Sequence, residues 1–438
     1  MCHCCWMSFL DFSTLLFIIR FKDVLYLKYK SVVRMYSLQT AHVTKNASHS
    51  STASSDFDAM STTTSITKPE KMSGRDFANY FYAYGFLGEQ KKMLECHRRM
   101  HAYYDSVFKN KDQFKDAVVL DVGTGSGILA IWAAQAGARK VYAVEATYMA
   151  NHARAMVAAN GVGDKVEVIQ GLMENLELPE KVDIIISEWM GLFLLRESML
   201  DSVLVARDKF MKPGGSMYPS HARMWVGAVA NHTASRNGQM DYQNSLTNFS
   251  NFVANTKNQY GVDFSCLMGE YDKEQSSAYM QTSEWCDISP DQILGAPAML
   301  KEFDLNTCTL KDIKVLNESF SLKIERPRGE PSASGEVHVA GFCGWFDVHF
   351  RGSKETPATT DVELTTAPDP NGATHWGQRC FWLYPGAVVS PGDSLNGEMH
   401  MQRNKENHRL MNVVFKFSNN RMVDGWWTPA RTAPFHIK

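Results

Sequence analysis

The chain has 438 residues, of which 44% are hydrophobic and 21% charged, a length and balance that predict a globular protein of more than one domain. Its formal charge is −2, and residues 70–438 carry 38 Lys or Arg against 43 Asp or Glu. Because nonspecific nucleic-acid binding depends on clustered cations, this mildly acidic body argues against a direct nucleic-acid partner and is compatible with a basic protein partner.

Residues 1–72 are expected to be a leader and linker outside the fold. Residues 7–19 form an apolar run that Asp11 interrupts; the run is shorter than the ~20 residues that span a bilayer, and no Lys or Arg precedes it. Residues 45–68 are rich in Ser and Thr, which indicates a disordered linker. A membrane anchor within residues 1–40 is an alternative that the short run and Asp11 disfavour, so no membrane partner is expected.

The cysteine pattern indicates the redox state of the cellular compartment in which the protein is expected. Three of the nine cysteines lie at the extreme N-terminus, and the other six are scattered between Cys96 and Cys380 without a repeated CxxC. This pattern suits a reducing compartment better than a disulfide scaffold or a zinc module. We therefore expect the protein in the cytoplasm, the nucleus or both.

Residues 73–220 are predicted to form an α/β domain. Aromatic and apolar side chains at helical spacing in residues 75–109 indicate helices that precede the sheet. Short β-branched runs then alternate with helical segments, and the second of these helices has Thr147 as its N-cap and Gly161 as its stop. The alternation predicts a doubly wound parallel sheet with helices on both faces. The expected strands are residues 118–123, 141–146, 165–170 and 181–189.

Residues 221–438 show a different pattern, with short strand-like segments separated by turn residues. We expect a second, mostly antiparallel domain here, a barrel or a sandwich. Residues 232–262 are more polar and less strand-like, which predicts a helical insertion. Apolar side chains in it, including Met240, Phe249 and Phe252, exceed what a solvated excursion needs, so the insertion is expected to provide a contact surface.

The segment DVGTGSG (121–127) joins the first expected strand to the first helix. Its glycines, beginning with Gly123, let the backbone turn tightly and approach a ligand beside the free N–H groups of a helix N-terminus. Glu145 ends the second strand, where an acid can accept both ribose hydroxyls of an adenosine-containing cofactor. Ile128 stands where a dinucleotide fingerprint has its third glycine, so the segment resembles the first motif of class I S-adenosylmethionine-dependent methyltransferases. Glu174 follows the third strand at the same edge of the sheet.

Two acids, Glu188 and Glu197, flank a mostly apolar segment after the fourth strand. Glu188 emerges at the carboxyl edge of the sheet, where ligands bind in open α/β sheets, and a hairpin would turn both carboxylates toward one pocket. Such a pair could share a proton, hold a metal ion or bind an organic cation. No His or Cys joins it at metal spacing, so no metal is expected. A guanidinium fits the pair best, because it is planar, permanently charged and offers parallel N–H donors.

Three further motifs accompany the cofactor segment: YFYAY (80–84), SEWMG to LLRESML (187–200) and ATHWGQ (373–378). Together they resemble the protein arginine methyltransferases, in which they form the YFxxY motif, the double-E loop and the Thr-His-Trp loop. The resemblance runs from about Asp76 to about Arg409. It is closest to the plant branch of the type I enzymes, through GWFDVHF, LTTAP and KENHRL.

The resemblance implies S-adenosylmethionine as cofactor and a role for each site residue. The residues implied are Glu188, Glu197 and His375 for catalysis; Gln90, Arg99, Gly123, Glu145 and Glu174 for the cofactor, with Arg99 on its carboxylate; and Met93, Met199 and Trp376 for the substrate pocket. Tyr80, Phe81 and Tyr84 are implied to lie in a helix that closes over the cofactor. The other interpretation of these aromatic side chains is ordinary amphipathic core.

This chain departs from the family pattern at three positions. Gln90 stands where many members have His, and an amide can still hydrogen-bond there. Cys96 replaces the Asp that usually pairs with the His of the Thr-His-Trp loop, which puts the brace on His375 in doubt. Leu192 replaces the usual Tyr after SEWMG, a change that bears on product or substrate preference.

The resemblance implies an enzyme that methylates arginine guanidino nitrogens of proteins, histones or Arg/Gly-rich proteins, giving monomethyl- and asymmetric dimethylarginine. In the family, a helical arm docks on the cofactor domain of a second subunit, so a homodimer is implied. The alternative is a weakened or inactive homologue that acts as a protein-binding scaffold. Cys96 favours this alternative, whereas the intact glycines and both glutamates oppose it.

Overall fold

The structure is a computed structural model that describes residues 80–82, 84–326, 335–419, 422–423, 426–427 and 429–438. These residues all belong to one compact unit, Glu70–Lys438. The expected leader and linker, with the apolar run inside them, lie outside the described residues. Among the helices that are described, none is both long enough and apolar enough to cross a membrane.

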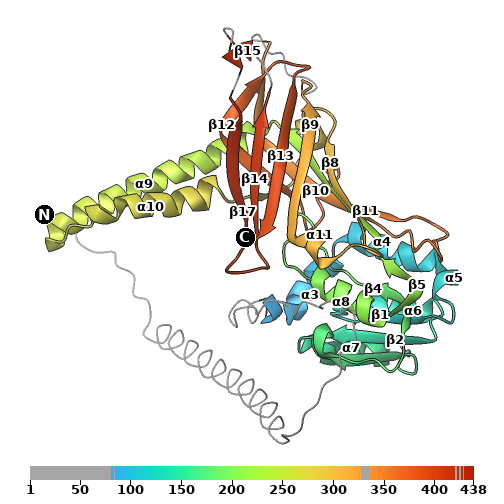
Figure 1. Ribbon diagram of the computed structural model, residues 1–438. Coiled ribbons are helices and arrows are strands. Elements are labelled where there is room, and N and C mark those ends of the chain that lie inside the picture. Colours follow the sequence, from blue (N-terminus) through green and yellow to red (C-terminus); the bar gives the residue numbers. More distant parts are fainter. Residues whose placement is uncertain (1–79, 83, 327–334, 420–421, 424–425, 428) are drawn as a thin grey trace, which may run out of the picture. The chain divides into compact units, whose positions relative to one another are not determined.

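The first part of this unit, here called the parallel half, contains one parallel sheet (Figure 1). Its elements are α3 (Leu87–Leu94), α4 (His97–Phe108), α5 (Lys111–Phe114), β1 (Val118–Val122), α6 (Ile128–Gln135), β2 (Lys140–Glu145), α7 (Met149–Ala159), β3 (Val166–Gln170), η1 (Met173–Asn175), β4 (Val182–Ile186), α8 (Leu200–Phe210) and β5 (Met211–Tyr218). The strand order is β3-β2-β1-β4-β5, and every neighbouring pair is parallel. Every residue of β1 is buried, as expected for a strand covered on both faces. The predicted parallel α/β fold is confirmed.

Two local predictions were wrong. The fourth strand ends at Ile186 and does not continue to residue 189, because its neighbour β5 ends opposite it at Tyr218 and offers no further ladder partner. Helix α7 has Tyr148 as its N-cap instead of Thr147. The Thr147 N–H is bound to the Glu145 carboxylate, which keeps Thr147 in the preceding turn, although its hydroxyl still accepts the N–H of the first helical residue.

The turn between β1 and α6 is the part of the sheet that matters most for the site. Three of its glycines have positive φ: 71° at Gly123, 55° at Gly125 and 88° at Gly127. Gly127 is the N-cap of α6 in the left-handed region, which side-chain-bearing residues rarely adopt. Asp121, buried at the end of β1, accepts the Ala130 N–H at 3.1 Å. The turn is therefore fixed by contacts within the chain.

The remainder, here called the antiparallel half, consists mainly of two antiparallel sheets. Its elements are β6 (His221–Val229), α9 (His232–Tyr260), η2 (Ser265–Leu267), α10 (Met268–Gln275), η3 (Ser276–Met280), β7 (Glu284–Cys286), η4 (Pro290–Gln292), β8 (Ala298–Asp304), α11 (Leu310–Lys314), β9 (Val315–Lys323), β10 (Val337–His349), β11 (Glu363–Thr365), β12 (Gln378–Val389), β13 (Ser394–Arg403), β14 (Met411–Ser418), β15 (Met422–Val423), β16 (Trp426–Trp427) and β17 (Arg431–Ile437). The larger sheet has the order β7-β12-β10-β6-β8 with β11 beside β10, and the smaller has the order β17-β14-β13-β9.

Aromatic side chains of both antiparallel sheets share one core. The ring of Phe342 on β10 lies 4.7 Å from that of Phe415 on β14, and the ring of Phe381 on β12 lies 5.2 Å from Phe415. Edge-to-face and offset contacts of this kind add to the area that the rings bury. The two sheets therefore pack face to face, in agreement with the barrel-like second half that the sequence predicted.

The predicted helical insertion is α9, which is followed by α10 returning along its side (Figure 1). The Asn231 side chain caps the first turn of α9, and Gly261, with a φ of 68°, ends the helix. The Phe249 ring stacks on Tyr271 of α10 with 4.0 Å between centroids. Met240 keeps 60% of its surface exposed, so the helix pair covers only part of its own apolar surface.

Candidate active site

A cavity of about 690 Å³ lies at the carboxyl edge of the parallel sheet. Its wall combines the glycine turn, the segment after β4, the N-terminal helices and the loop before β12. The wall contains all eleven residues that the sequence analysis assigned to the site: Gln90, Met93, Arg99, Gly123, Glu145, Glu174, Glu188, Glu197, Met199, His375 and Trp376. Both halves of the chain therefore contribute to one site.

The segment between the two acids, here called the acid loop (residues 188–197), folds back on itself as expected. The Gly191 N–H donates to Leu194 O at 2.9 Å, and the Leu194 N–H donates to Gly191 O at 3.0 Å. Phe193, Leu194 and Glu197 have φ values of 48°, 68° and 90° although none of them is glycine. Backbone of this kind costs about 1–3 kcal/mol per residue and persists where its surroundings hold it. The acid loop is therefore a strained element that the rest of the fold supports.

Glu188 forms a buried ion pair with Arg99 of α4. Arg99 donates to one oxygen, Glu188 Oε2, from Nε at 3.0 Å and from Nη2 at 2.8 Å. Both side chains are only 10% exposed. The sequence analysis expected Arg99 on the cofactor carboxylate, so this pairing is a contact that it did not predict.

The other carboxylate oxygen of Glu188 has spare capacity. Oε1 is buried and has no hydrogen-bond partner among the described residues. Burial raises the pKa of Glu188, while the Arg99 charge and the nearby Met190 N–H oppose the rise. Buried polar atoms are normally satisfied, so an orphaned carboxylate oxygen in a cavity wall indicates a cationic or donor ligand.

Glu197 is held by hydrogen bonds to both of its oxygens. Oε2 accepts the Tyr84 hydroxyl at 2.7 Å, and Oε1 accepts Nη1 of Arg196 at 3.0 Å. Burial and the Glu197 charge raise the pKa of Tyr84, so its phenol remains a donor. Each carboxylate oxygen has a second lone pair, which leaves Glu197 able to accept further donors from the cavity.

A turn from the antiparallel half fixes the backbone of Glu197. The Glu197 N–H donates to Arg409 O at 2.8 Å, and the Arg409 guanidinium donates to Glu197 O. That guanidinium lies 3.7 Å from the centroid of the Tyr80 ring. Arg409 therefore connects the acid loop to the YFYAY segment. The sequence analysis did not identify this role of Arg409. Glu197 and Arg409 are 212 positions apart, and no local sequence pattern predicts a contact between them.

The cofactor side of the cavity is shaped by glycine backbone and by acids. Glu145 is 7% exposed and accepts the Gly125 N–H at 3.0 Å and the Thr147 N–H at 2.8 Å, one on each oxygen. Each oxygen keeps an acceptor position for a ligand hydroxyl. A Cβ added at Gly123 would lie 2.2 Å from Cε of the flexible Met199 side chain, which would have to move, and the φ of 71° at Gly123 is strained for a residue with a side chain.

Gln90 and Glu174 complete that side. Gln90 is buried and donates to Tyr84 O at 3.4 Å, and a Cβ added at Gly125 would lie 2.8 Å from its Oε1. Glu174 in η1 accepts the Ser202 hydroxyl at 2.6 Å. Glycine backbone flanked by carboxylates suits the ribose and base of an adenosine-containing ligand.

His375 and Trp376 reach the cavity from the loop before β12. Trp376 is buried, and its Nε1 donates to Met190 O of the acid loop at 2.8 Å. The His375 ring lies against the Trp376 ring with 3.8 Å between centroids. Desolvation by surrounding atoms and the charge of Arg99 lower the pKa of His375 to about 4, so the imidazole is neutral at pH 7. The Trp285 Nε1 donates to His375 O at 3.2 Å.

The structure holds His375 in a different way from the carboxylate pairing that is usual in the family. Cys96 is the N-cap of α4 and its side chain caps no backbone N–H. The neighbouring Glu95 pairs with Lys91 on the surface of α3. Within the described part of the chain, no carboxylate is bonded to the His375 ring. The doubt raised by Cys96 is therefore justified for the imidazole, whereas the backbone of the loop is held by Trp285.

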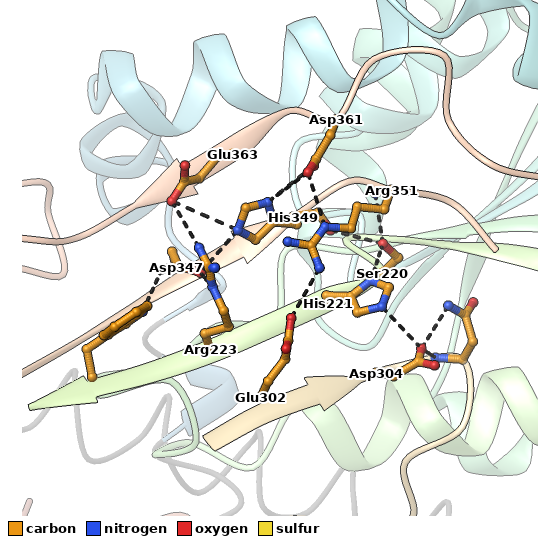
Figure 2. Close-up of polar contacts among 12 residues, drawn as sticks. Ser220, His221, Arg223, Glu302, Asp304, Asp347, His349, Arg351, Asp361 and Glu363 are labelled. Carbon is orange, nitrogen blue, oxygen red and sulfur yellow. Dashed lines mark hydrogen bonds and ion pairs between the residues drawn. The ribbon is translucent and has the colours of Figure 1, made fainter. Parts of the chain in front are cut away.

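Figure 2 shows a second polar cluster on β6, β8, β10 and the segment leading to β11, made of residues outside the cavity wall. Arg223 donates to Asp347 Oδ1 at 2.7 Å and to Glu363 Oε1 at 3.4 Å. His349 is 7% exposed at its side chain, with Nε2 3.4 Å from Asp347 and Nδ1 3.2 Å from Asp361. Opposite charges thus alternate across neighbouring strands.

Possible ligand atoms of Asp347, His349 and Glu363 lie within 4.8 Å of one another, a grouping found nowhere else in the described residues. Arg223 already joins the two carboxylates and supplies the positive charge that a metal ion would bring. Burial opposes ionisation of Asp347, but the nearby His349 ring and hydrogen bonds from Arg223 and Trp225 hold its pKa below the usual range. We interpret the cluster as an ion-pair network that joins strands, and assign no metal to it.

Comparisons with known sequences agree with the geometry of the cavity. Residues 119–215 match the family described as "Methyltransferase domain", and residues 239–422 match the "Arginine methyltransferase oligomerization subdomain". The chain is 49% identical over 363 residues to protein arginine N-methyltransferase PRMT10 of Oryza sativa subsp. japonica, which covers 83% of this chain and 93% of that protein. It is 50% identical over 338 residues to PRMT10 of Arabidopsis thaliana, covering 77% of this chain and 86% of that protein.

Solved structures lead to the same family. The crystal structure of Arabidopsis thaliana protein arginine methyltransferase 10, described as a uniquely open conformation, matches with a TM-score of 0.77 and 46% identity over 82% of this chain and 100% of that chain. The Trypanosoma brucei PRMT1 enzyme-prozyme complex with AdoHcy matches with a TM-score of 0.66 and 31% identity over 81% and 100%. With a paired-acid cavity on a parallel sheet and relatives at this identity and coverage, the chain belongs to the protein arginine methyltransferase family.

Proposed function

We propose that the protein transfers methyl groups from S-adenosylmethionine to guanidino nitrogens of arginine residues in other proteins. The observation that carries the proposal is the pair of acids. Glu188 Oε1 is buried without a hydrogen-bond partner among the described residues, and Glu197 lies in the same cavity wall. A guanidinium satisfies that orphaned acceptor with an N–H donor and brings a permanent charge that offsets the second carboxylate.

The cofactor is S-adenosylmethionine. When bound, it supplies a methyl group that its sulfonium charge has already activated. The residues around the glycine turn fit its adenosine, because Gly123 lets the backbone approach closely and Glu145 keeps acceptor positions for the ribose hydroxyls. The Trypanosoma brucei relative was solved with AdoHcy, which supports the same ligand class here.

The chain's own residues mainly orient the nucleophile. A guanidinium has a pKa above ~12 and is a poor nucleophile while its charge is delocalised. Glu188 and Glu197 draw that charge toward the nitrogens they bind, which leaves the remaining nitrogen richer in electrons. Arg99 holds Glu188, while Tyr84 and the backbone contacts of Arg409 hold Glu197. Holding the reacting groups in a productive orientation can supply up to ~7–11 kcal/mol of a catalytic barrier.

The proposed products are monomethyl- and asymmetric dimethylarginine, as expected for a type I enzyme. The Thr-His-Trp loop and the methionines Met93 and Met199 in the cavity wall support the asymmetric product through the family resemblance. The proposed substrates are proteins with exposed arginines, such as histones or Arg/Gly-rich proteins, and the acidic balance of residues 70–438 supports this class. Cytoplasm, nucleus or both remains the proposed location, because the scattered cysteines suit a reducing compartment.

We also propose that the protein is a two-fold homodimer. Residues 239–422 match an oligomerization subdomain. The α9–α10 pair leaves Met240 60%, Tyr260 75% and Val262 50% exposed. Apolar side chains left exposed along this arm indicate a contact site, and a second copy that offers the same arm would give an isologous interface.

Mass spectrometry of product arginines tests the proposed activity. The purified protein is incubated with isotopically labelled S-adenosylmethionine and either a histone mixture or an Arg/Gly-rich peptide. We expect labelled monomethyl- and asymmetric dimethylarginine, with no label when the Glu188→Gln protein is used. Symmetric dimethylarginine alone would contradict the type I assignment. A folded protein that binds both cofactor and peptide without transfer would support the scaffold alternative.

A further inference from the structure

Arg98, in the first turn of α4, makes a contact with the turn at residues 369–372. Its Nη1 lies 3.3 Å from Asp369 Oδ2, and its Nη2 donates to Gly372 O. The side chains of Arg98 and Asp369 are 33% and 34% exposed. One guanidinium thus binds both the first and the last residue of a four-residue turn, a geometry that suits the rigid forked donors of Arg better than the single ammonium of Lys.

The turn presents the Asp369 carboxylate to this guanidinium. Asp369 Oδ1 accepts the Asn371 N–H at 2.8 Å and the Asn371 side-chain amide at 3.0 Å, which leaves Oδ2 for Arg98. The Gly372 N–H donates to Asp369 O at 3.1 Å and closes the turn. Hydrogen bonds from Asn371, reinforced by the Arg98 charge and opposed by desolvation, lower the pKa of Asp369. The carboxylate is therefore ionised at neutral pH.

The contacts of Arg98 and its neighbour Arg99 form a closed path, here called the ring, that starts at α4, passes through the acid loop and returns to α4. From the 369–372 turn the chain continues to Trp376, whose Nε1 donates to Met190 O at 2.8 Å. Met190 follows Glu188 by two residues, and Glu188 accepts two bonds from Arg99. The ring returns through Arg99 to α4. Arg99 therefore binds Glu188 directly. Arg98, the adjacent residue of the same helical turn, binds the 369–372 turn, from which the chain leads to Trp376 and its contact with Met190.

We propose that Arg98 is a positioning residue for methyl transfer, which rests on the proposed function. Arg98 lies outside the cavity wall, so it acts through the loop and not on the substrate or cofactor. Without it, the 369–372 turn loses its attachment to α4, and Trp376 no longer holds Met190 and Glu188 at a fixed distance from Arg99. Because partly exposed ion pairs contribute little to global stability, the main loss is expected in the rate of transfer.

Arg98→Ala tests the proposal. We expect kcat to fall by about tenfold or more, with cofactor affinity and melting temperature close to those of the wild type. Arg98→Lys should be intermediate, because an ammonium can pair with Asp369 but cannot bind both ends of the turn. Combining Arg98→Ala with Asp369→Ala should lower kcat no further than Arg98→Ala alone, since both changes open the same ring.

The matched control is Lys109→Ala. Lys109 caps the other end of α4 and forms a comparable ion pair with Asp105 at 2.7 Å, but it contacts neither the acid loop nor the 369–372 turn. This variant should keep the wild-type kcat. Equal kcat for the Arg98 and Lys109 variants would overturn the proposal, as would a loss of melting temperature in Arg98→Ala large enough to account for the lost activity.

Hydrogen exchange supplies a readout that does not depend on activity. Residues 369–378 should exchange faster in Arg98→Ala than in the wild type and in Lys109→Ala, because the turn has lost its attachment. Unchanged exchange would overturn the positioning role whatever the kinetics show. A wild type that fails to methylate arginine would instead refute the proposed function, and the exchange data would still decide whether Arg98 holds the loop.

Discussion

Glu188 and Glu197 are chemically identical side chains that the fold holds in different ways. Arg99 donates twice to one oxygen of Glu188, whereas the two oxygens of Glu197 accept separately from the Arg196 guanidinium and the Tyr84 phenol. Glu188 therefore keeps one oxygen without a hydrogen-bond partner among the described residues, whereas both oxygens of Glu197 already accept a hydrogen bond. The two acids therefore offer a bound guanidinium unequal partners, which favours one orientation of it.

Glu188→Gln is expected to lower the rate of methyl transfer by more than tenfold, a loss above ~1.4 kcal/mol. The amide keeps the shape of the carboxylate but removes the charge that the proposed guanidinium requires. Cofactor affinity, measured by calorimetry, should change little, because Glu188 faces Arg99 and not the glycine turn. Transfer above about a tenth of the wild-type rate would remove Glu188 from its proposed role.

The control for this variant is Glu145→Ala, in which the order of effects should be reversed. Glu145 accepts the N–H groups of Gly125 and Thr147, so its loss removes both a ligand acceptor and a support of the glycine turn. Affinity for the cofactor should fall by ~1.5–3 kcal/mol. If both variants weakened the cofactor equally, the separation of the cavity into two functional sides would be wrong.

The Cys96→Asp variant tests whether His375 needs a carboxylate at position 96, as the family pattern suggests, or whether other contacts already hold its loop. If a carboxylate at this position braced His375, the variant should gain activity. Because Arg98 and Trp285 already hold the loop, we expect no gain in kcat. As N-cap of α4, Asp should instead stabilise the protein by ~0.5–1 kcal/mol, visible as a higher melting temperature. A severalfold rise in kcat would show that the imidazole itself lacks a necessary partner.

At the scale of elements, the α9–α10 pair behaves as one unit. The Phe249 ring stacks on Tyr271, and the Ser245 hydroxyl donates to Gln275 at 2.8 Å. Removal of one helix would expose the inner face of the other, so a useful deletion takes both. The pair nevertheless keeps apolar groups exposed, which a solvated excursion would not need.

Replacing residues 235–277 by a short linker is expected to give a folded monomer with weaker cofactor binding. The proposed docking of the pair on a second copy would support the N-terminal helices that line the cofactor cavity, and the deletion removes this support. Light scattering gives the mass and calorimetry gives the affinity. A wild-type protein that is monomeric and fully active at micromolar concentration would contradict the proposal.

At the scale of the whole molecule, stability should depend on pH through a buried acid. Burial raises the pKa of Asp121 from 3.8 to about 7, while the Thr124 hydroxyl and the Ala130 N–H oppose the rise. Between these values the folded protein keeps a proton that the unfolded chain has released. Stability therefore falls as pH rises through this window, by ~1.4 kcal/mol for each unit of pKa shift.

Asp121→Asn cannot ionise and should lose this part of the pH dependence. Between about pH 4 and about pH 7, its melting temperature is expected to fall less than that of the wild type. Calorimetric scans of the two proteins in the same buffers give the comparison. Parallel curves would show that Asp121 already ionises at the pH of the unfolded chain.

The sequence predicted much of the fold because its strongest signals are local. A short sequence window is enough to predict each of three features: the β-branched strand at 118–122, the glycines after it and the polar helix from residue 232. The acid loop was expected as a hairpin, but its positive φ values at three non-glycine residues could not be foreseen, since no residue type encodes them. The Arg98 and Arg409 contacts join residues more than 200 positions apart, so only tertiary packing reveals them.

The backbone bonds between Glu197 and Arg409 also matter for synthesis of the chain. Domains generally fold from the N-terminus while the ribosome still holds the remainder. The parallel sheet is complete once Tyr218 has emerged, yet the acid loop gains its backbone partners only when the β13–β14 turn follows, close to the C-terminus. A nascent or prematurely terminated chain can therefore form the glycine turn on the cofactor side of the cavity while Glu197 still lacks its backbone partner Arg409. We therefore expect methyl transfer to begin only when the chain is nearly complete.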